Sequence, residues 1–103
     1  MKTVYSVAGE LVKCLAEEGF TVYLSFDEDG DASILTSWRN SGDAHGRYGV
    51  VAEDGLHTYA LIGFQGRPKG ASAAGTTSDV SIERFVEAMK QFRSNPMKIP
   101  DLG

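Results

Sequence analysis

The sequence predicts an α+β fold, in which a four-stranded antiparallel meander sheet carries two helices on one face. Three observations support this fold class. Apolar residues follow a helical spacing near both ends of the chain, four short segments between them alternate like strands, and turn-forming stretches join these segments. Short connections make consecutive strands neighbours, so we expect the order α-β-β-β-β-α in a single domain over residues 1–95.

Residues 3–18 are expected to form the first helix. Their apolar residues recur at the i, i+3, i+4 and i+7 positions of an amphipathic helix, and Gly19 follows as a stop signal. Cys14 lies on the apolar stripe. We therefore expect a buried structural thiol there rather than a reactive one, which would need exposure and a nearby cation.

Residues 19–38 are predicted to form a β-hairpin. Apolar residues at every second position from Phe20 to Phe26 are typical of a half-buried strand, and the alternation resumes from Ala32 to Trp38. The stretch between them, residues 27–31, contains four acidic residues and Gly30, which supply the side-chain bonding and the backbone freedom that a tight turn needs.

The middle of the chain predicts a second hairpin. Residues 39–47 form a polar connection with two glycines, and a third strand follows over residues 48–52, weakened by Gly49. Glu53-Asp54-Gly55 is the strongest short-range turn signal of the chain, and it leads into a fourth strand over residues 56–64.

The last third of the chain contains a loop, a helix and a tail. Residues 65–77 are rich in glycine, alanine, serine and threonine and show no periodicity. Ser81 is a good N-cap for a second helix, which Asn95-Pro96 ends. We expect residues 96–103 to form a mobile tail.

Composition limits the class of protein. The 103 residues are 42% hydrophobic and 23% charged with a net charge of −4, which is ordinary for a globular domain and argues against nucleic-acid binding. One cysteine forms no internal disulfide, and neither a signal peptide nor a membrane span is evident. A cytoplasmic protein without a membrane contact is the simplest expectation.

The predicted meander separates the charges. Acidic residues gather at the two hairpin tips, whereas the opposite end of the sheet collects five basic side chains: Arg39, His45, Arg47, Arg67 and Lys69. The glycine-rich loop at that end follows a strand and precedes a helix, as phosphate-binding loops do, although no lysine follows its second glycine. These features indicate an anion-binding site in the loops at 39–47 and 65–77, with Trp38 and Tyr48 as stacking surfaces.

Neither metal binding nor catalysis has a complete set of residues. Residues 27–31 resemble the start of a calcium-binding EF-hand loop, but the segment runs into Ile34 and Leu35 and lacks the closing glutamate. We expect no metal and no cofactor. His45 and His57 lie toward opposite ends of the predicted sheet, and no nucleophile is visibly paired with either, so the sequence favours a non-enzymatic protein without deciding the matter.

The second face of the sheet gives the preferred function. Two amphipathic helices cover one face, and the hairpin register then leaves a mixed aromatic and aliphatic set on the other face: Tyr23, Leu35, Val51, Tyr59 and Leu61. Contiguous apolar patches with tyrosines mark partner surfaces. The sequence therefore predicts a small interaction module that binds itself as a homodimer, or another protein, through the open face or an edge strand. A domain that binds a nucleotide or another anionic small molecule, with or without catalysis, is the alternative.

Overall fold

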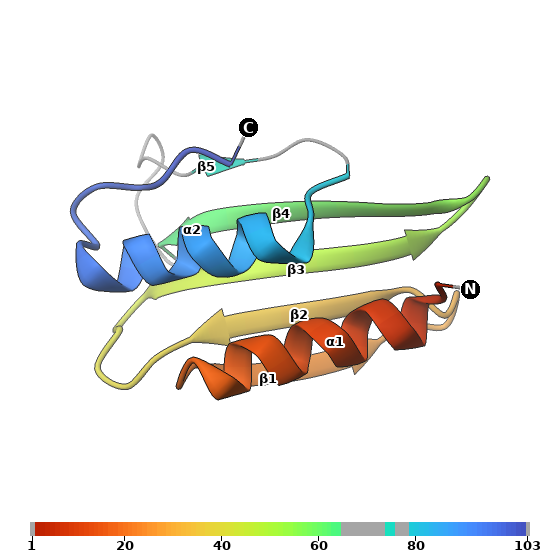
Figure 1. Ribbon diagram of the computed structural model, residues 1–103, viewed down its shortest axis with the longest axis horizontal. Coiled ribbons are helices and arrows are strands. Elements are labelled where there is room, and N and C mark those ends of the chain that lie inside the picture. Colours follow the sequence, from red (N-terminus) through yellow and green to blue (C-terminus); the bar gives the residue numbers. More distant parts are fainter. Residues whose placement is uncertain (1, 65–73, 76–78, 103) are drawn as a thin grey trace.

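The elements follow one another in the predicted order in the computed structural model, which describes residues 2–64, 74–75 and 79–102 (Figure 1). They are α1 (Val4–Glu17), β1 (Thr21–Phe26), β2 (Ala32–Ser37), β3 (Ala44–Ala52), β4 (Leu56–Phe64), β5 (Ala74–Gly75) and α2 (Ile82–Ser94). The radius of gyration is 13.1 Å, close to the value of about 13 Å expected of a folded domain of this length.

The sheet is an antiparallel meander with the strand order β1-β2-β3-β4-β5. The four predicted strands are confirmed. The fifth, β5, has two residues that pair with Leu61 and Ile62, and the sequence did not predict it. A two-residue strand held by backbone hydrogen bonds leaves no alternation in the sequence that would mark it.

Helix α1 begins and ends at local signals. The Thr3 hydroxyl accepts a hydrogen bond from Ser6 N at 3.0 Å and the Ser6 hydroxyl accepts one from Thr3 N at 2.8 Å, so the two residues form a capping box. At the other end Gly19 takes a φ of +87°, which glycine adopts without strain, and Phe20 N donates to Leu15 O. These caps fix the length of the helix at the predicted limits.

Helix α2 lies against the second hairpin (Figure 1). The Ser81 side chain caps its first turn by accepting from Arg84 N at 3.1 Å, as predicted. Phe85, Met89 and Phe92 are fully buried on its inner side. We expected residues 96–103 to be a mobile tail. The described part of this segment, residues 96–102, returns along the helix, and Pro100 and Leu102 are buried (Figure 1).

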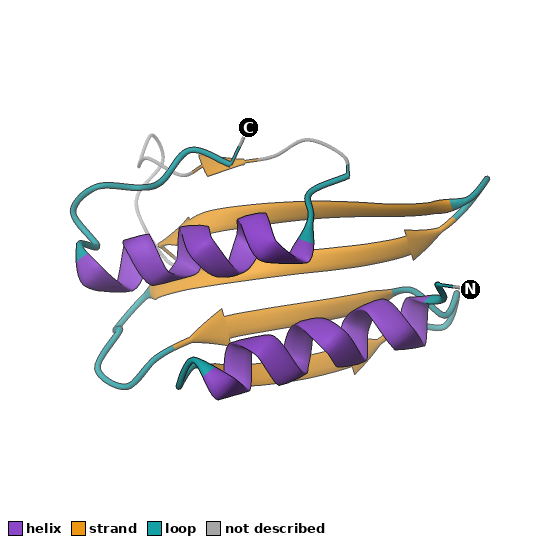
Figure 2. Cartoon of the chain, in the orientation of Figure 1, coloured by secondary structure: helices purple, strands orange, loops and turns teal. Residues whose placement is uncertain are grey.

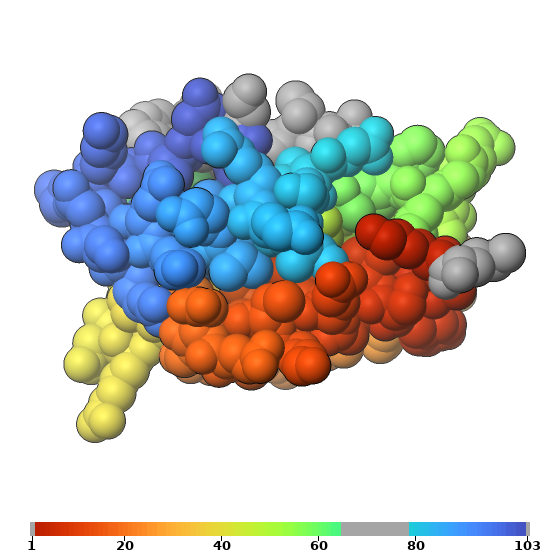
Figure 3. All heavy atoms as spheres, viewed as in Figure 1, coloured from red at the N-terminus to blue at the C-terminus, as the bar shows by residue number. Residues whose placement is uncertain are grey.

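The two helices lie on the same face of the sheet and meet there, so the molecule has two layers (Figures 2 and 3). The core between the layers contains the predicted inward residues of β2, β3 and β4, including Ile34, Val50 and Ile62, none of which is exposed. Leu24 and Phe26 of β1 share this face but remain partly exposed, because β1 is the edge strand. No described element covers the opposite face.

Candidate functional site

The open face of the sheet carries a row of side chains that crosses four strands. The register pairs Tyr23 with Leu35, Leu35 with Arg47, and Arg47 with Leu61. Directly opposed residues in antiparallel strands point to the same side, so these four side chains lie next to one another. Tyr23 is 68% exposed and Leu61 is 39% exposed. The row therefore forms a continuous apolar band with one cation in it.

The other two predicted interface residues lie in two further rows on the same face. Tyr59 pairs with Gly49, and a Cβ placed on Gly49 would lie 2.0 Å from Cε1 of the Tyr59 ring. The ring therefore occupies the space that a side chain at position 49 would take. Val51 pairs with His57 one step further along. The structure thus brings the five predicted interface residues together on one face, but whether they bind a partner remains a prediction.

Arg47 lies within this face, not in a loop. Its Nη1 donates to Ser33 Oγ at 2.9 Å, and this hydrogen bond joins the neighbouring strands β3 and β2 on the open face. The sequence placed residues 39–47 in a loop, and this is wrong for the second half of that range, because β3 begins at Ala44. Arg47 therefore belongs to the sheet and not to the loop at its end.

Of the remaining residues of the predicted anion site, the structure describes His45 and Arg39. His45 lies in β3, where its Nδ1 is 3.1 Å from the Asp43 carbonyl oxygen, and Arg39 is exposed in the turn before that strand. Arg67 and Lys69, like most of the predicted glycine-rich loop, lie outside the described residues. Binding of an anionic small molecule stays a prediction.

Tyr48 was expected to offer a stacking surface to a ligand, and this is wrong. Its ring is 1% exposed on the helix face of β3, and its hydroxyl donates to Val80 O, which also accepts from Thr58 Oγ1 at 2.8 Å. Burial raises the pKa of the Tyr48 hydroxyl, an interaction with Thr58 lowers it, and the carboxylates of Glu83, Asp79 and Glu10 raise it again. The residue is part of the core.

Trp38, the other predicted stacking surface, has its ring engaged within the protein. It stands edge-on to Phe92 with ring centroids 5.5 Å apart, and edge-on to Phe20 at 6.4 Å. The indole links the end of β2 to α2 and to Phe20, which lies between α1 and β1. This arrangement accounts for the tryptophan through packing.

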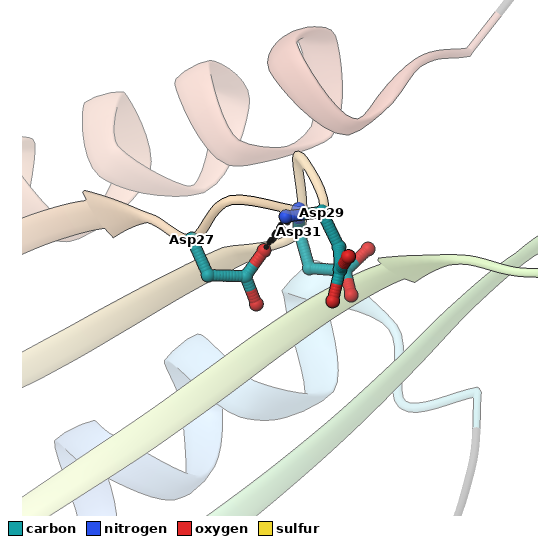
Figure 4. Close-up of side chains that lie close together, drawn as sticks. All are labelled: Asp27, Asp29 and Asp31. Carbon is teal, nitrogen blue, oxygen red and sulfur yellow. Dashed lines mark hydrogen bonds between the residues drawn. The ribbon is translucent and has the colours of Figure 1, made fainter.

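The acidic turn between β1 and β2 brings three carboxylates together (Figure 4). Oxygen atoms of Asp27, Asp29 and Asp31 all lie within 4.8 Å of one another. Asp27 Oδ1 accepts from Asp29 N at 2.9 Å and from Asp31 N at 3.0 Å, while Asp31 Oδ1 accepts from Ala52 N at 3.1 Å. Hydrogen bonds to backbone N–H groups therefore account for Asp27 and Asp31 without a metal ion. The bond from Ala52 N to Asp31 also joins the first hairpin to the second.

The histidines offer one arrangement that the sequence did not predict. Asp79 N donates to Thr58 O, which holds the segment after β5 beside β4 and brings the Asp79 carboxylate 3.4 Å from His57 Nδ1. Both side chains are about half exposed or more. An oriented histidine is one part of a catalytic base, but no contact of His57 with a nucleophile is present among the described residues.

Cys14 is half-buried, less than predicted. It lines a cavity of about 300 Å³ between α1 and α2, together with Glu10, Glu17 and Lys90. The sequence could not show this, because the helical stripe gives the direction of a side chain and not the distance to the next helix.

Comparison with known proteins gives no relative: no family model, curated protein or solved structure matches the chain. No helix among the described residues is long and apolar enough to span a membrane.

Proposed function

We infer that the protein is an interaction module that binds a second copy of itself through the open face of its sheet. The observation that carries this proposal is the row Tyr23, Leu35, Arg47 and Leu61, which crosses four strands with no described element over it. Tyrosine and arginine are enriched among residues that dominate binding energy in protein interfaces. The cytoplasmic location expected from the cysteine content is part of this proposal.

Two side chains of the open face are already held in place for binding, which favours association beyond what their exposure alone would. Arg47 is held by Ser33, so its guanidinium is already oriented and loses little freedom on binding. The ring of Tyr59 is supported from below by Gly49, which provides a flat aromatic surface next to the row. A two-fold axis displaced from Arg47 would set each guanidinium over a tyrosine of the partner and would avoid opposing the two cations.

Leu61→Asp tests this proposal. The new carboxylate would stand beside Arg47, its cross-strand partner, which limits the effect on folding, while a second charge at the β4 end of the band opposes burial in an interface. The molar mass by light scattering should fall relative to the natural sequence at the same concentration. Gln91→Lys, on the exposed outer side of α2, is the control and should leave the mass unchanged. A mass unaffected by Leu61→Asp would overturn the proposal.

A further inference from the structure

The second surface of interest is the free edge of the sheet. Within the described residues β1 pairs with β2 alone, in six consecutive pairs without a bulge, so its other side presents unpaired backbone groups. Natural edge strands are blocked by lysine, proline, bulges or inward charges. The six residues of β1, Thr21–Phe26, contain no charge, no proline and no glycine. This edge therefore remains available to another strand.

The helix side of this edge is apolar and exposed. Leu24 is 38% exposed, Phe26 is 45% exposed, and the ring of Tyr5, 69% exposed, lies 5.2 Å from the ring of Phe26. These three side chains form a shelf beside α1 that nothing in the described part of the chain covers.

The flank of α1 above this shelf carries no charge. Tyr5, Gly9, Val12 and Ala16 follow one another at the i, i+4, i+7 and i+11 spacing, and the contact of Tyr5 with Phe26 shows that this flank faces the edge. The opposite flank, which carries Glu10 and Glu17, faces α2. Helix α1 is therefore polar toward α2 and outward, and uncharged toward the edge of the sheet.

No described residue accounts for the glycine at position 9. A glycine inside a helix costs about 1 kcal/mol relative to alanine, and a Cβ at this position would meet no atom within 4 Å. Close approach of a helix from another copy would account for the missing side chain.

We propose that β1 pairs antiparallel with β1 of a second copy, about a two-fold axis perpendicular to the sheet. The two sheets become one, and the two α1 helices lie side by side on the same face with the Tyr5, Leu24 and Phe26 shelves between them. This contact is made by the backbone of β1 and by the helix side of the sheet edge, whereas the open face lies on the other side of the sheet; Tyr23 is the residue that borders both. The edge contact does not depend on the function proposed above.

A second copy of the same chain is the occupant that the chemistry favours. The unpaired backbone N–H and C=O groups of an edge strand are best satisfied by another strand. A two-fold axis places each residue of β1 opposite a residue of the other copy that points to the same face of the sheet. In the register that we propose, Tyr23 lies opposite Tyr23 of the second copy. That register sets Asp27 opposite Gly19 of the other copy. Arg93 Nη1 lies 3.7 Å from the position that a Cβ on Gly19 would take, so an acid faces a cation at both ends of the contact.

The mutational test compares two leucines of nearly equal exposure on opposite faces, Leu24 at 38% and Leu61 at 39%. Lysine is the natural blocker of strand edges, so Leu24→Lys should lower the molar mass by about twofold by removing the edge contact. If Leu24→Lys keeps the mass of the natural protein, the edge contact is wrong, whatever Leu61→Asp does. If only Leu61→Asp lowers the mass, the open face is supported and the edge proposal fails.

Hydrogen exchange on the natural protein gives an independent test that needs no variant. Pairing at the edge would protect the outward amides of residues 21–26, so their exchange should slow at least about tenfold between dilute and concentrated samples. Association through the open face leaves these amides free. A concentrated sample of doubled mass in which the β1 amides exchange at the dilute rate would refute the edge contact.

Discussion

The ring of Tyr59 fills the space above Gly49, whereas Gly46, three residues earlier on β3, faces the side chain of Met89 in the core. A Cβ on Gly46 would lie 2.3 Å from Met89 Sδ, and one on Gly49 would lie 2.0 Å from the Tyr59 ring. The two glycines thus avoid clashes of similar severity, but one clash is enclosed and the other borders solvent.

The two glycines should therefore differ in their response to alanine. Gly46→Ala forces Met89 and Phe85 apart in a closed core and should lower the free energy of unfolding by about 1–3 kcal/mol. Gly49→Ala can be accommodated by rotation of the exposed Tyr59 side chain and should cost less than about 1 kcal/mol. Urea denaturation of both variants measures the difference, and equal losses would contradict this account of the two contacts.

Two threonines should respond in opposite directions to valine. The Thr36 hydroxyl is fully buried without a hydrogen-bond partner among the described residues, so Thr36→Val should raise the free energy of unfolding by about 1 kcal/mol. Thr58 Oγ1 donates to Val80 O, so Thr58→Val should lower the same free energy by about 1 kcal/mol. Thermal or urea unfolding of the two variants measures both changes. A lower free energy of unfolding in both would show that the Thr36 hydroxyl has a hydrogen-bond partner.

Stability should fall at alkaline pH because of Tyr48. Burial raises the pKa of its hydroxyl in the folded state. Below about pH 10 the phenol is protonated in both states and its contribution is complete; above that, the unfolded chain releases the proton more readily. The free energy of unfolding then decreases by up to about 1.4 kcal/mol per pH unit until the folded-state pKa is reached.

The variant Tyr48→Phe isolates this effect. It lacks the titrating hydroxyl, so urea denaturation between about pH 9 and 11 should show a shallower decline than in the natural protein. At neutral pH the variant should be about 1 kcal/mol less stable, because the hydrogen bond to Val80 O is lost. Identical slopes in the two proteins would mean that Tyr48 titrates as freely in the folded chain as in the unfolded one.

The acidic turn should tolerate the loss of one aspartate better than the loss of another. Asp31→Ala removes the hydrogen bond to Ala52 N and should lower the free energy of unfolding by about 1 kcal/mol. Asp29 enters the turn through its backbone N–H, so Asp29→Ala should change stability by less than about 0.5 kcal/mol. Both variants remove one negative charge and serve as controls for each other. Equal stability of the two would show that the Asp31 side chain does not join the hairpins.

Local patterns predicted most of the fold because local forces produce it. Alternation placed β1, β2 and β4, and the turns at Gly30 and Gly55, both with positive φ, set the register that decides which residues share a face. The same parity placed the five predicted interface residues together. It also places Tyr48 in line with Val50 on the helix face, so attention to parity would have excluded Tyr48 as a ligand-stacking surface.

The start of β3 was missed for a reason that lies elsewhere in the chain. Gly46 and Gly49 lower the strand propensity of residues 44–49, and they are needed because Met89 and Tyr59 occupy the space beside them. Those contacts come from other elements, and no window of neighbouring residues contains them. The proximity of Asp79 to His57 depends in the same way on a backbone bond to β4.

The short strand β5 gives the sheet two unlike edges. It pairs with Leu61 and Ile62 along the outer side of β4, and Asp79 N bonds to Thr58 O further along the same side. Strand addition is thereby restricted on that side, while β1 stays open on the other. Proteins with two free edges risk runaway polymerisation into fibres. Under the edge pairing proposed above, the sheet stops growing after a single pairing event, so this contact closes a pair of sheets and does not extend into a fibre.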